Sequence, residues 1–167
     1  MHFLHALNGS VLKHGDPAGK PLEVDLRPPL PHRIRLYLYN ATSPPGGRTL
    51  GECKAQLIVP GQERGQLGNF DFSEERVAVL SGYNAVHDVF VLWDAGLHSD
   101  FGYSKNVQVK PETLYAAAAG RLATQDRRLR APGGTVTETV VAARSAKLKE
   151  ALRLRADLSR ERLLRPV

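Results

Sequence analysis

Hydrophobic residues are densest between residues 82 and 109, and this stretch predicts the centre of the fold. Residues 89–93 (VFVLW) form an unbroken run of β-branched, aromatic and aliphatic side chains. Such a run predicts a strand that is buried on both faces and lies centrally in a sheet. Residues 82–85 predict a turn into this strand, and residues 104–109 (SKNVQV) predict a further strand after it.

Strict alternation of apolar and polar residues marks residues 33–39 (RIRLYLY) as a second strand. Three aliphatic residues alternate there with two arginines and two tyrosines. Because successive side chains of a strand point to opposite faces, the pattern predicts a half-buried strand with the arginines and tyrosines on its solvent face. Residues 49–59 predict an antiparallel partner for it, and residues 73–80 predict a short strand or one helical turn.

Helical periodicity appears in three places. Residues 2–13 predict a short helix, and residues 111–119 predict a helix with a proline at its first position. Residues 121–130 predict a basic connection. After it, a Thr-x-x-Glu capping box and apolar residues at helical spacing predict a long helix over residues 135–164. Together these elements predict an α+β fold, a single domain with a central mixed or antiparallel sheet flanked by helices and a long C-terminal basic helix.

Composition is that of one globular domain. The chain has 167 residues, of which 42% are hydrophobic and 24% charged. We therefore assign residues 1–167 to a single recognition domain with its core at about residues 30–155. No apolar run approaches the roughly 18 residues that cross a bilayer, so we expect no membrane partner. The single cysteine, Cys53, and the lack of a recognisable secretory signal favour a cytoplasmic protein.

Positive charge is concentrated in the last third of the chain. The net charge is +6, and residues 121–167 contain 12 Lys and Arg but only 5 Asp and Glu. This asymmetry favours a polyanionic partner, with nucleic acid as the first candidate. A basic helix surface that faces only solvent is the alternative that composition leaves open.

Glu52 and Lys54 suggest a catalytic hypothesis. Residues i and i+2 of a strand share a face, so this carboxylate and this ammonium group would project together, as in metal-dependent nucleases. Asp25 lies upstream and is the candidate for the second carboxylate. Elsewhere the His, Cys and carboxylate residues lack the spacing of a metal site, so we expect no resident metal and no cofactor.

Several stretches together resemble a known family. They are PHRIRLYLYN, a Pro-Gly-Gly loop, GECKAQLIVPG, GNFDF, GYNAVHDVFVLWDA, FGYSKNVQV and VVAARSAKLKEALRLR. In this order, over about residues 30–155, they resemble the DNA sulfur-binding domain of McrA-type, modification-dependent (type IV) restriction endonucleases. The resemblance implies a bacterial, cytoplasmic, nucleoid-associated defence protein. Its partner would be double-stranded DNA carrying a phosphorothioate, in which sulfur replaces a non-bridging phosphate oxygen.

The resemblance also implies where the binding residues lie. In that family a small cavity with apolar walls holds the sulfur, basic residues bind flanking phosphates, and polar side chains read bases. The matching sulfur and base contacts fall on three segments, which are Pro31, His32 and Arg33, then Tyr83, Asn84 and Ala85, then Tyr103, Ser104, Lys105 and Asn106. Candidates for DNA-backbone contacts are Arg35, Arg48 and Arg64. We expect the three segments to meet at one phosphate-sized surface cavity.

The family's HNH nuclease centre has no counterpart in this chain. That centre needs clustered histidines around a metal, and no histidine follows Lys110. The resemblance therefore implies a non-catalytic recognition module. An HNH nuclease domain is expected C-terminal to it in the full-length protein, and homodimerisation is left open.

Two other functions stay open at this point. One is a domain that binds a modified base such as methylcytosine, flipped out of the duplex between aromatic side chains. The aromatic residues available for this are Tyr37, Tyr39, Tyr83, Trp93 and Tyr103. The other is the metal-dependent nuclease built on Glu52 and Lys54.

Overall fold

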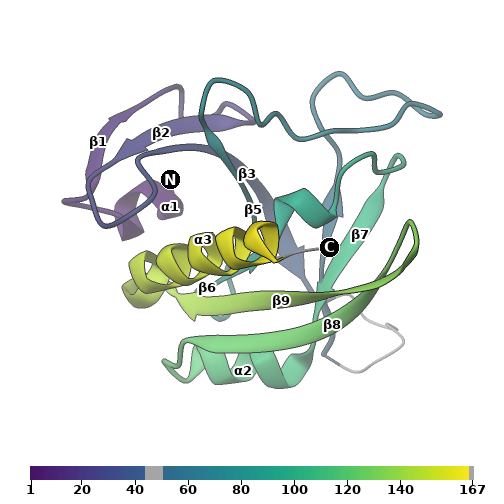
Figure 1. The fold of residues 1–167 in the computed structure, drawn as a ribbon. Coiled ribbons are helices and arrows are strands. Elements are labelled where there is room, and N and C mark those ends of the chain that lie inside the picture. The colour runs from purple at the N-terminus through teal and green to yellow at the C-terminus, as the bar shows by residue number, and fades with distance from the viewer. Residues whose placement is uncertain (44–50, 166–167) are drawn as a thin grey trace.

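The computed structural model describes residues 1–43 and 51–165 of the chain (Figure 1). The helices of this part are α1 (His2–Ala6), α2 (Pro111–Ala118) and α3 (Leu148–Leu164). The strands are β1 (Val11–His14), β2 (Leu22–Leu26), β3 (Arg33–Thr42), β4 (Cys53–Leu57), β5 (Val77–Asn84), β6 (Val89–Trp93), β7 (Lys105–Val109), β8 (Ala123–Ala131) and β9 (Gly134–Arg144). Two short 3-10 helices, Ala95–Leu97 and Ser145–Lys147, precede β7 and α3.

One mixed sheet organises the fold. Its strands lie in the order β1-β2-β3-β5-β6-β9-β8, and all neighbours on this path are antiparallel except β3 and β5. The end of β3 also pairs with β4, which in turn pairs with β7. β3 therefore belongs both to the main sheet and to a smaller layer, β3-β4-β7. The predicted α+β fold with a mixed sheet, flanking helices and a C-terminal helix is confirmed.

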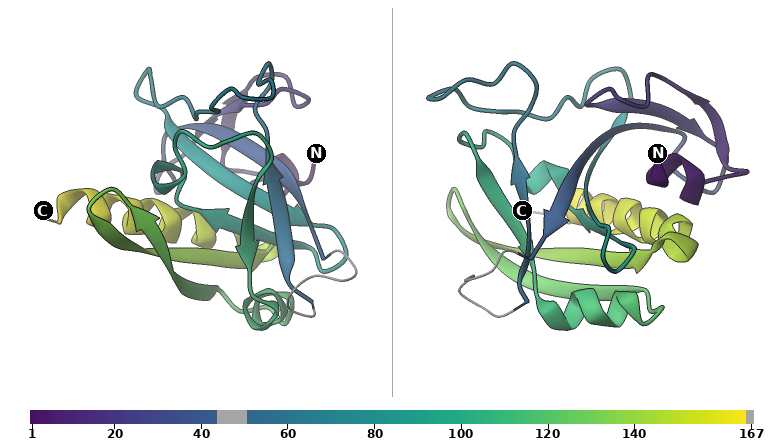
Figure 2. Two further views of the ribbon diagram at one scale, coloured as in Figure 1. Left: turned by 90° about the vertical axis from the view of Figure 1, so that its right-hand side faces the viewer. Right: turned by 180° about the vertical axis from the view of Figure 1, so that it is seen from behind.

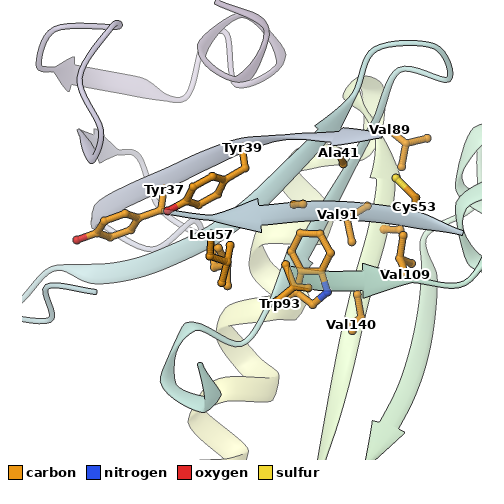
Figure 3. Packing of buried hydrophobic residues seen from close by; sticks show 14 of the residues in the cluster. Tyr37, Tyr39, Ala41, Cys53, Leu57, Val89, Val91, Trp93, Val109 and Val140 are labelled. Atoms are coloured by element: carbon orange, nitrogen blue, oxygen red, sulfur yellow. The ribbon is translucent and has the colours of Figure 1, made fainter. Parts of the chain in front are cut away.

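One half of the core lies between the main sheet and the smaller layer in which β4 pairs with β7 (Figure 3). β6 is buried along its whole length, as its apolar run predicts, and lies between β5 and β9. Trp93 at its end contacts both layers, and its indole Nε1 donates to the carbonyl of Gln108 on β7 at 3.0 Å. Leu114 and Ala117 of α2 close this half of the core. Trp93 is therefore a scaffold residue whose one donor is satisfied.

Helices α1 and α3 cover the opposite face of the main sheet (Figures 1 and 2). Phe3 of α1 and Leu148, Ala151 and Leu152 of α3 pack against aliphatic residues of β2, β3, β6 and β9. α3 runs across β6 and β9, and most of its charged side chains are exposed or half-buried, whereas Arg155 is buried against the sheet. Among the residues described, no helix is long and apolar enough to cross a membrane.

The predicted long helix is wrong over residues 135–147. Residues 123–144 instead form the β8–β9 hairpin, whose strands are joined by Pro132 and Gly133. Proline followed by glycine suits a type II turn, and Gly133 has the positive φ of 86° that this turn requires. The β-branched residues after the turn favour a strand, and they pair across the hairpin. Glu138 lies inside β9, so it caps no helix.

Two other predicted boundaries differ from the structure. Residues 2–13 contain the short helix α1 and then β1, rather than one helix. β5 continues to Asn84, so the turn into β6 follows Asn84 instead of starting at Gly82. β4 is antiparallel to β3, as predicted, but it pairs only with Ala41 and Thr42, the last two residues of β3.

The face of β3 that was expected to meet solvent is buried. Tyr37 and Tyr39 are only 3% and 6% exposed, because β4 and the loop that follows it cover them (Figure 3). Burial raises the pKa of Tyr39 well above its ordinary value. The alternation itself is confirmed, since Ile34 and Leu36 face the α1 and α3 side. Alternation alone shows which side chains share a face, but it does not show what covers that face.

Candidate nucleic-acid interface

Helix α3 forms a ridge between two surface grooves. Groove 1, of about 670 Å³, lies between α3 and the start of β3. It is lined by residues 29–33, by Glu75 and Val77, and by one face of α3 between Arg153 and Leu163. Groove 2, of about 700 Å³, lies between the opposite face of α3 and the β8–β9 hairpin. The basic helix predicted from the sequence is therefore the element that both grooves share.

Groove 1 combines apolar walls with positive charge. Its apolar lining includes the rings of Pro29 and Pro31 and the side chain of Val77. Three arginines, Arg33, Arg153 and Arg160, outnumber the two carboxylates of Glu75 and Asp157 in the same lining. Asp157 also lies 3.4 Å from Arg160 in an exposed ion pair, which contributes little to stability.

The cations of groove 1 come from two directions. Arg33 lies at the first position of β3, and its guanidinium donates to the carbonyl of Glu74 at 3.2 Å. Arg153 and Arg160 lie two turns apart on α3, at the i and i+7 spacing that places side chains on one helix face. His32 precedes Arg33, and its Nδ1 lies 3.2 Å from the carbonyl of Leu26. An anion in groove 1 would therefore meet positive charge from the sheet and from the helix.

Groove 2 is lined mainly by polar side chains. Thr135, Thr137 and Thr139 of β9 line one wall, and Arg162 of α3 and Arg165, which directly follows α3, line the other. The Thr139 hydroxyl donates to a carboxylate oxygen of Asp126 at 2.7 Å. The hydroxyl groups of Thr135 and Thr137 lie on exposed residues nearer to the tip of the hairpin.

A buried carboxylate at the end of β6 anchors α3 to the sheet. Asp94 is 3% exposed, and its Oδ2 accepts from Arg162 at 2.7 Å and from Arg155 at 3.4 Å. Arg155 also donates to the carbonyl of Thr139 on β9. Burial lowers the pKa of Arg155, whereas the nearby charge of Asp94 opposes that shift. These contacts fix the position of α3 and therefore the width of both grooves.

A second buried cluster fixes the base of the hairpin. Glu138 of β9 is 1% exposed, and its Oε1 accepts from the backbone N–H of Asp94 at 2.9 Å. The same oxygen lies 2.8 Å from His98 Nε2, and His98 Nδ1 lies 3.1 Å from Lys105 Nζ. Burial lowers the pKa of Lys105. The chain of contacts ties β9 to the connection between β6 and β7.

The first of the three predicted binding segments lies in groove 1. Pro31, His32 and Arg33 all line it, next to residues of α3. Their role in DNA binding stays a prediction, but their position beside Arg153 and Arg160 is the arrangement that such a role requires.

The other two segments do not meet the first, so the predicted convergence is wrong. Tyr83 pairs with Asn40 in the register of β3 and β5, seven residues along β3 from Arg33. At about 3.3 Å per residue, that separation is roughly 23 Å. Asn106 pairs with Gln56 on β4, in the other layer of the fold. One phosphate-sized cavity cannot contain all three segments.

Several residues of these two segments have contacts within the fold. Tyr83 stacks on His2, with 4.9 Å between ring centroids. Asn84 is buried and donates to the carbonyl of Ala41 at 3.1 Å. Three of the other members are exposed, namely Ala85 in the turn before β6, Tyr103, and Asn106 on β7. Ser104 is half-buried and has a φ of 66°, and Lys105 contacts His98.

The predicted DNA-backbone residues have three different outcomes. Arg64 lies exposed in the loop between β4 and β5, where its predicted role stays open. Arg48 lies outside the described residues. Arg35 is 4% exposed, and its guanidinium lies 3.0 Å from Glu23, 3.1 Å from Asp71 and 2.6 Å from Glu74. Arg35 is therefore not available to DNA in this structure.

Replacing Arg35 by alanine tests this correction. Arg35→Ala is expected to lower the free energy of unfolding by about 1–3 kcal/mol, because charged hydrogen bonds are lost while the half-exposed carboxylates regain water. Urea denaturation measures the loss, and Arg27→Ala, at an exposed arginine, should change stability by less than about 0.5 kcal/mol. Unchanged stability together with lost DNA binding would contradict the structural role of Arg35.

The proposed nuclease triad is not assembled. Asp25 pairs with Arg33 at the start of β3 and lies 3.1 Å from Arg76, whereas Lys54 pairs with Thr42 at the end of β3. Nine residues of extended strand separate these ends by roughly 30 Å. Glu52 and Lys54 do lie near each other, at 3.9 Å. Over the described ranges, no group of three or more His, Cys, Asp or Glu residues is placed to hold a metal ion.

The aromatic residues considered for a flipped base do not form a pocket together. Tyr37, Tyr39 and Trp93 are buried in the core, and Tyr83 packs against Phe90 with 4.6 Å between ring centroids. No Phe, Tyr or Trp side chain lines groove 1 among the described residues. The structure thus offers no observation that favours a flipped base there.

Sequence reasoning did not single out the α3 residues of the two grooves. Arg153 and Arg160 carry a recognisable signal, since two arginines seven residues apart share a face of a helix. Asp94 and Glu138 carry no such signal, because their buried partners are distant in the sequence. Only the packing of α3 and of the hairpin brings these partners together.

Comparisons with known proteins identify the family of the chain. A search of curated proteins found no match, and neither did a search of solved structures. The model of the family Methylase-associated X1 (MTaX1) matches residues 32–152. The matched segment runs from His32 in groove 1 to Leu152 on α3 and covers well over half of the chain. The chain therefore belongs to the Methylase-associated X1 family.

Proposed function

We propose that this domain binds double-stranded DNA through α3 and groove 1, and that groove 1 recognises a phosphorothioate. The observation that carries the proposal is the joint lining of groove 1. Proline rings and an aliphatic side chain lie there beside Arg33, Arg153 and Arg160. Arginines provide charge for the phosphate backbone, and the apolar wall provides a surface that an ordinary phosphate oxygen would not favour.

The chemistry of a phosphorothioate matches this mixed lining. The group keeps the negative charge of a phosphate diester, so arginine donors still bind it. Sulfur is larger and more polarisable than oxygen, so it gains more from dispersion contacts with the Pro29 and Pro31 rings. Discrimination would then come from the apolar wall, and affinity from the arginines.

The family name supports a role in DNA modification. A methylase-associated family fits a domain that reads a modified substrate or directs a modifying system to it. The concentration of positive charge in residues 121–167 supports a polyanionic substrate. We extend the proposal to a recognition module of a cytoplasmic type IV restriction system, in which a nuclease domain elsewhere in the full-length protein cuts the DNA.

A mobility-shift assay at fixed salt tests the proposal. One duplex is compared with and without a single Rp phosphorothioate, and we expect binding at least about tenfold tighter with sulfur, or ~1.4 kcal/mol. Pro31→Gly should reduce this ratio by removing part of the apolar wall. Arg33→Gln and Arg153→Gln should weaken binding to both duplexes and each reduce the salt slope by about 1.

The control is Arg121→Gln, which removes an exposed arginine outside groove 1. It should leave the sulfur preference unchanged. Equal affinity of the wild-type chain for the two duplexes would refute phosphorothioate recognition. A preference for a methylated duplex without sulfur would instead favour a modified base as the ligand.

A further inference from the structure

The β8–β9 hairpin extends beyond the part that packs into the core. Ala123 on β8 and Glu138 and Val140 to Ala143 on β9 are buried, but the residues from Thr124 to Thr137 are exposed or half-buried. In Figure 1 and in the right-hand view of Figure 2, the tip of the hairpin, which Pro132 and Gly133 form, extends past the end of α3. The outer half of the hairpin is therefore a two-stranded ribbon supported by the domain at one end only.

The two faces of this ribbon differ. On one face, Arg127 donates to the carbonyl of Gln108 at 3.1 Å and lies 3.9 Å from Glu138, so its guanidinium is held by the core. On the other face, Arg128 pairs with Thr137 and Arg130 pairs with Thr135 in the strand register, and all four residues are exposed. Within the described residues, neither Arg128 nor Arg130 has an ion pair or a side-chain hydrogen bond.

This exposed face is continuous with groove 2. Thr135 and Thr137 line groove 2, and the opposite wall carries Arg162 of α3 and Arg165 just after the helix. Acidic residues in the groove are mostly engaged, since Asp94 binds Arg155 and Arg162 and Asp126 accepts from Thr139. Threonines of the ribbon face and arginines at the C-terminal end of α3 thus line the same groove, and Arg128 and Arg130 pair with two of these threonines in the strand register.

We propose that the β8–β9 hairpin enters the DNA major groove and that Arg128 and Arg130 select guanine in the sequence next to the modification. The inference rests on the proposed binding of double-stranded DNA and adds a sequence-reading element to it. The major groove is about 12 Å wide and admits a two-stranded β-ribbon. An arginine fork donates to O6 and N7 of guanine, which is the commonest specific contact of arginine with a base.

Duplex DNA fits this face better than a protein partner does. The side chains are cations and hydroxyl groups, with no exposed apolar residue among Arg128, Arg130, Thr135 and Thr137 to anchor a protein interface. β8 is an edge strand of the main sheet, so one side of the ribbon is sterically open to a groove. Charge and shape both match a nucleic acid groove.

Selection from a pool of duplexes with random bases around one phosphorothioate tests the inference. The wild-type chain should enrich guanine at one or two fixed positions. Arg128→Gln and Arg130→Gln should each reduce the preference at one position by about tenfold. Arg128→Lys keeps the charge but not the fork, so it should lose the guanine preference while retaining the salt slope. Arg121→Gln, at an exposed arginine just before β8 and far from the tip, is the matched control.

The same selection with oxygen-only duplexes separates this inference from the proposed function. Loss of guanine preference in the hairpin variants without any effect of sulfur would support the hairpin and refute phosphorothioate recognition. Sulfur selectivity with an unchanged base preference in Arg128→Gln and Arg130→Gln would overturn the hairpin assignment and leave the proposed function standing. Thermal melts of the variants would show that they fold, because neither side chain is part of the core.

Discussion

Asp94→Ala is expected to lower the free energy of unfolding by about 3–5 kcal/mol. Asp94 is the carboxylate that faces Arg155, and Arg155 is only 6% exposed. Removing the carboxylate leaves that guanidinium buried without its opposite charge. It also removes the acceptor for Arg162 and for the backbone N–H of Gly96. α3 would then lose its main polar attachment to β6.

Urea denaturation measures this loss, and Asp157→Ala is the matched control. Asp157 lies on the same helix, but its ion pair with Arg160 is exposed, so its removal should cost less than about 1 kcal/mol. Asp94→Ala should also weaken DNA binding under conditions where it stays folded, because both grooves depend on the position of α3. A stability equal to that of Asp157→Ala would show that Asp94 does not anchor the helix.

Trp93→Ala is expected to lower the free energy of unfolding by about 3–5 kcal/mol. The indole is 1% exposed and contacts both layers of the core, so its removal leaves a cavity that the two sheets cannot fill. The carbonyl of Gln108 also loses its donor. Gly82 shows how close the packing is, since a Cβ there would lie 3.1 Å from the indole.

Trp93→Phe separates the two contributions of the tryptophan. It keeps most of the buried volume and loses the hydrogen bond, so it should cost clearly less than Trp93→Ala in the same denaturation experiment. Because the indole lines neither groove, sulfur preference and base preference should survive in molecules that remain folded. If Trp93→Ala cost no more than Trp93→Phe, the cavity would not be the source of the loss.

The sequence predicts an element correctly where its pattern of apolar residues is compatible with only one kind of structure. The apolar run of β6 has no amphipathic alternative, so its burial on both faces was predictable. The hairpin was missed because Val140 and Val141 also suit a helical spacing that continues into the genuine helix α3. The Pro132 and Gly133 turn between two alternating segments was the available signal for a hairpin.

Only one side of groove 1 was predicted from the sequence, because its two sides are far apart along the chain. Pro31, His32 and Arg33 were identified from the resemblance to the sulfur-binding domains, and they do share a groove. Their partners on α3 come from more than 100 residues further along the chain, and only the packing of α3 on the sheet brings them together. Arg35 was misassigned because a strand pattern does not show that Glu23, Asp71 and Glu74 surround the guanidinium.

The position of β3 has a consequence for how quickly the chain folds. β3 pairs with β2 before it, with β4 after it, and in parallel with β5, whose first paired residue, Val77, lies more than 40 residues from its partner, Ile34. Contacts between distant residues require the closure of long loops before any pairing energy is gained. Refolding is therefore expected on the millisecond-to-second scale of non-local β proteins, and stopped-flow Trp93 fluorescence, at the junction of both layers, would follow the joining of the two sheets.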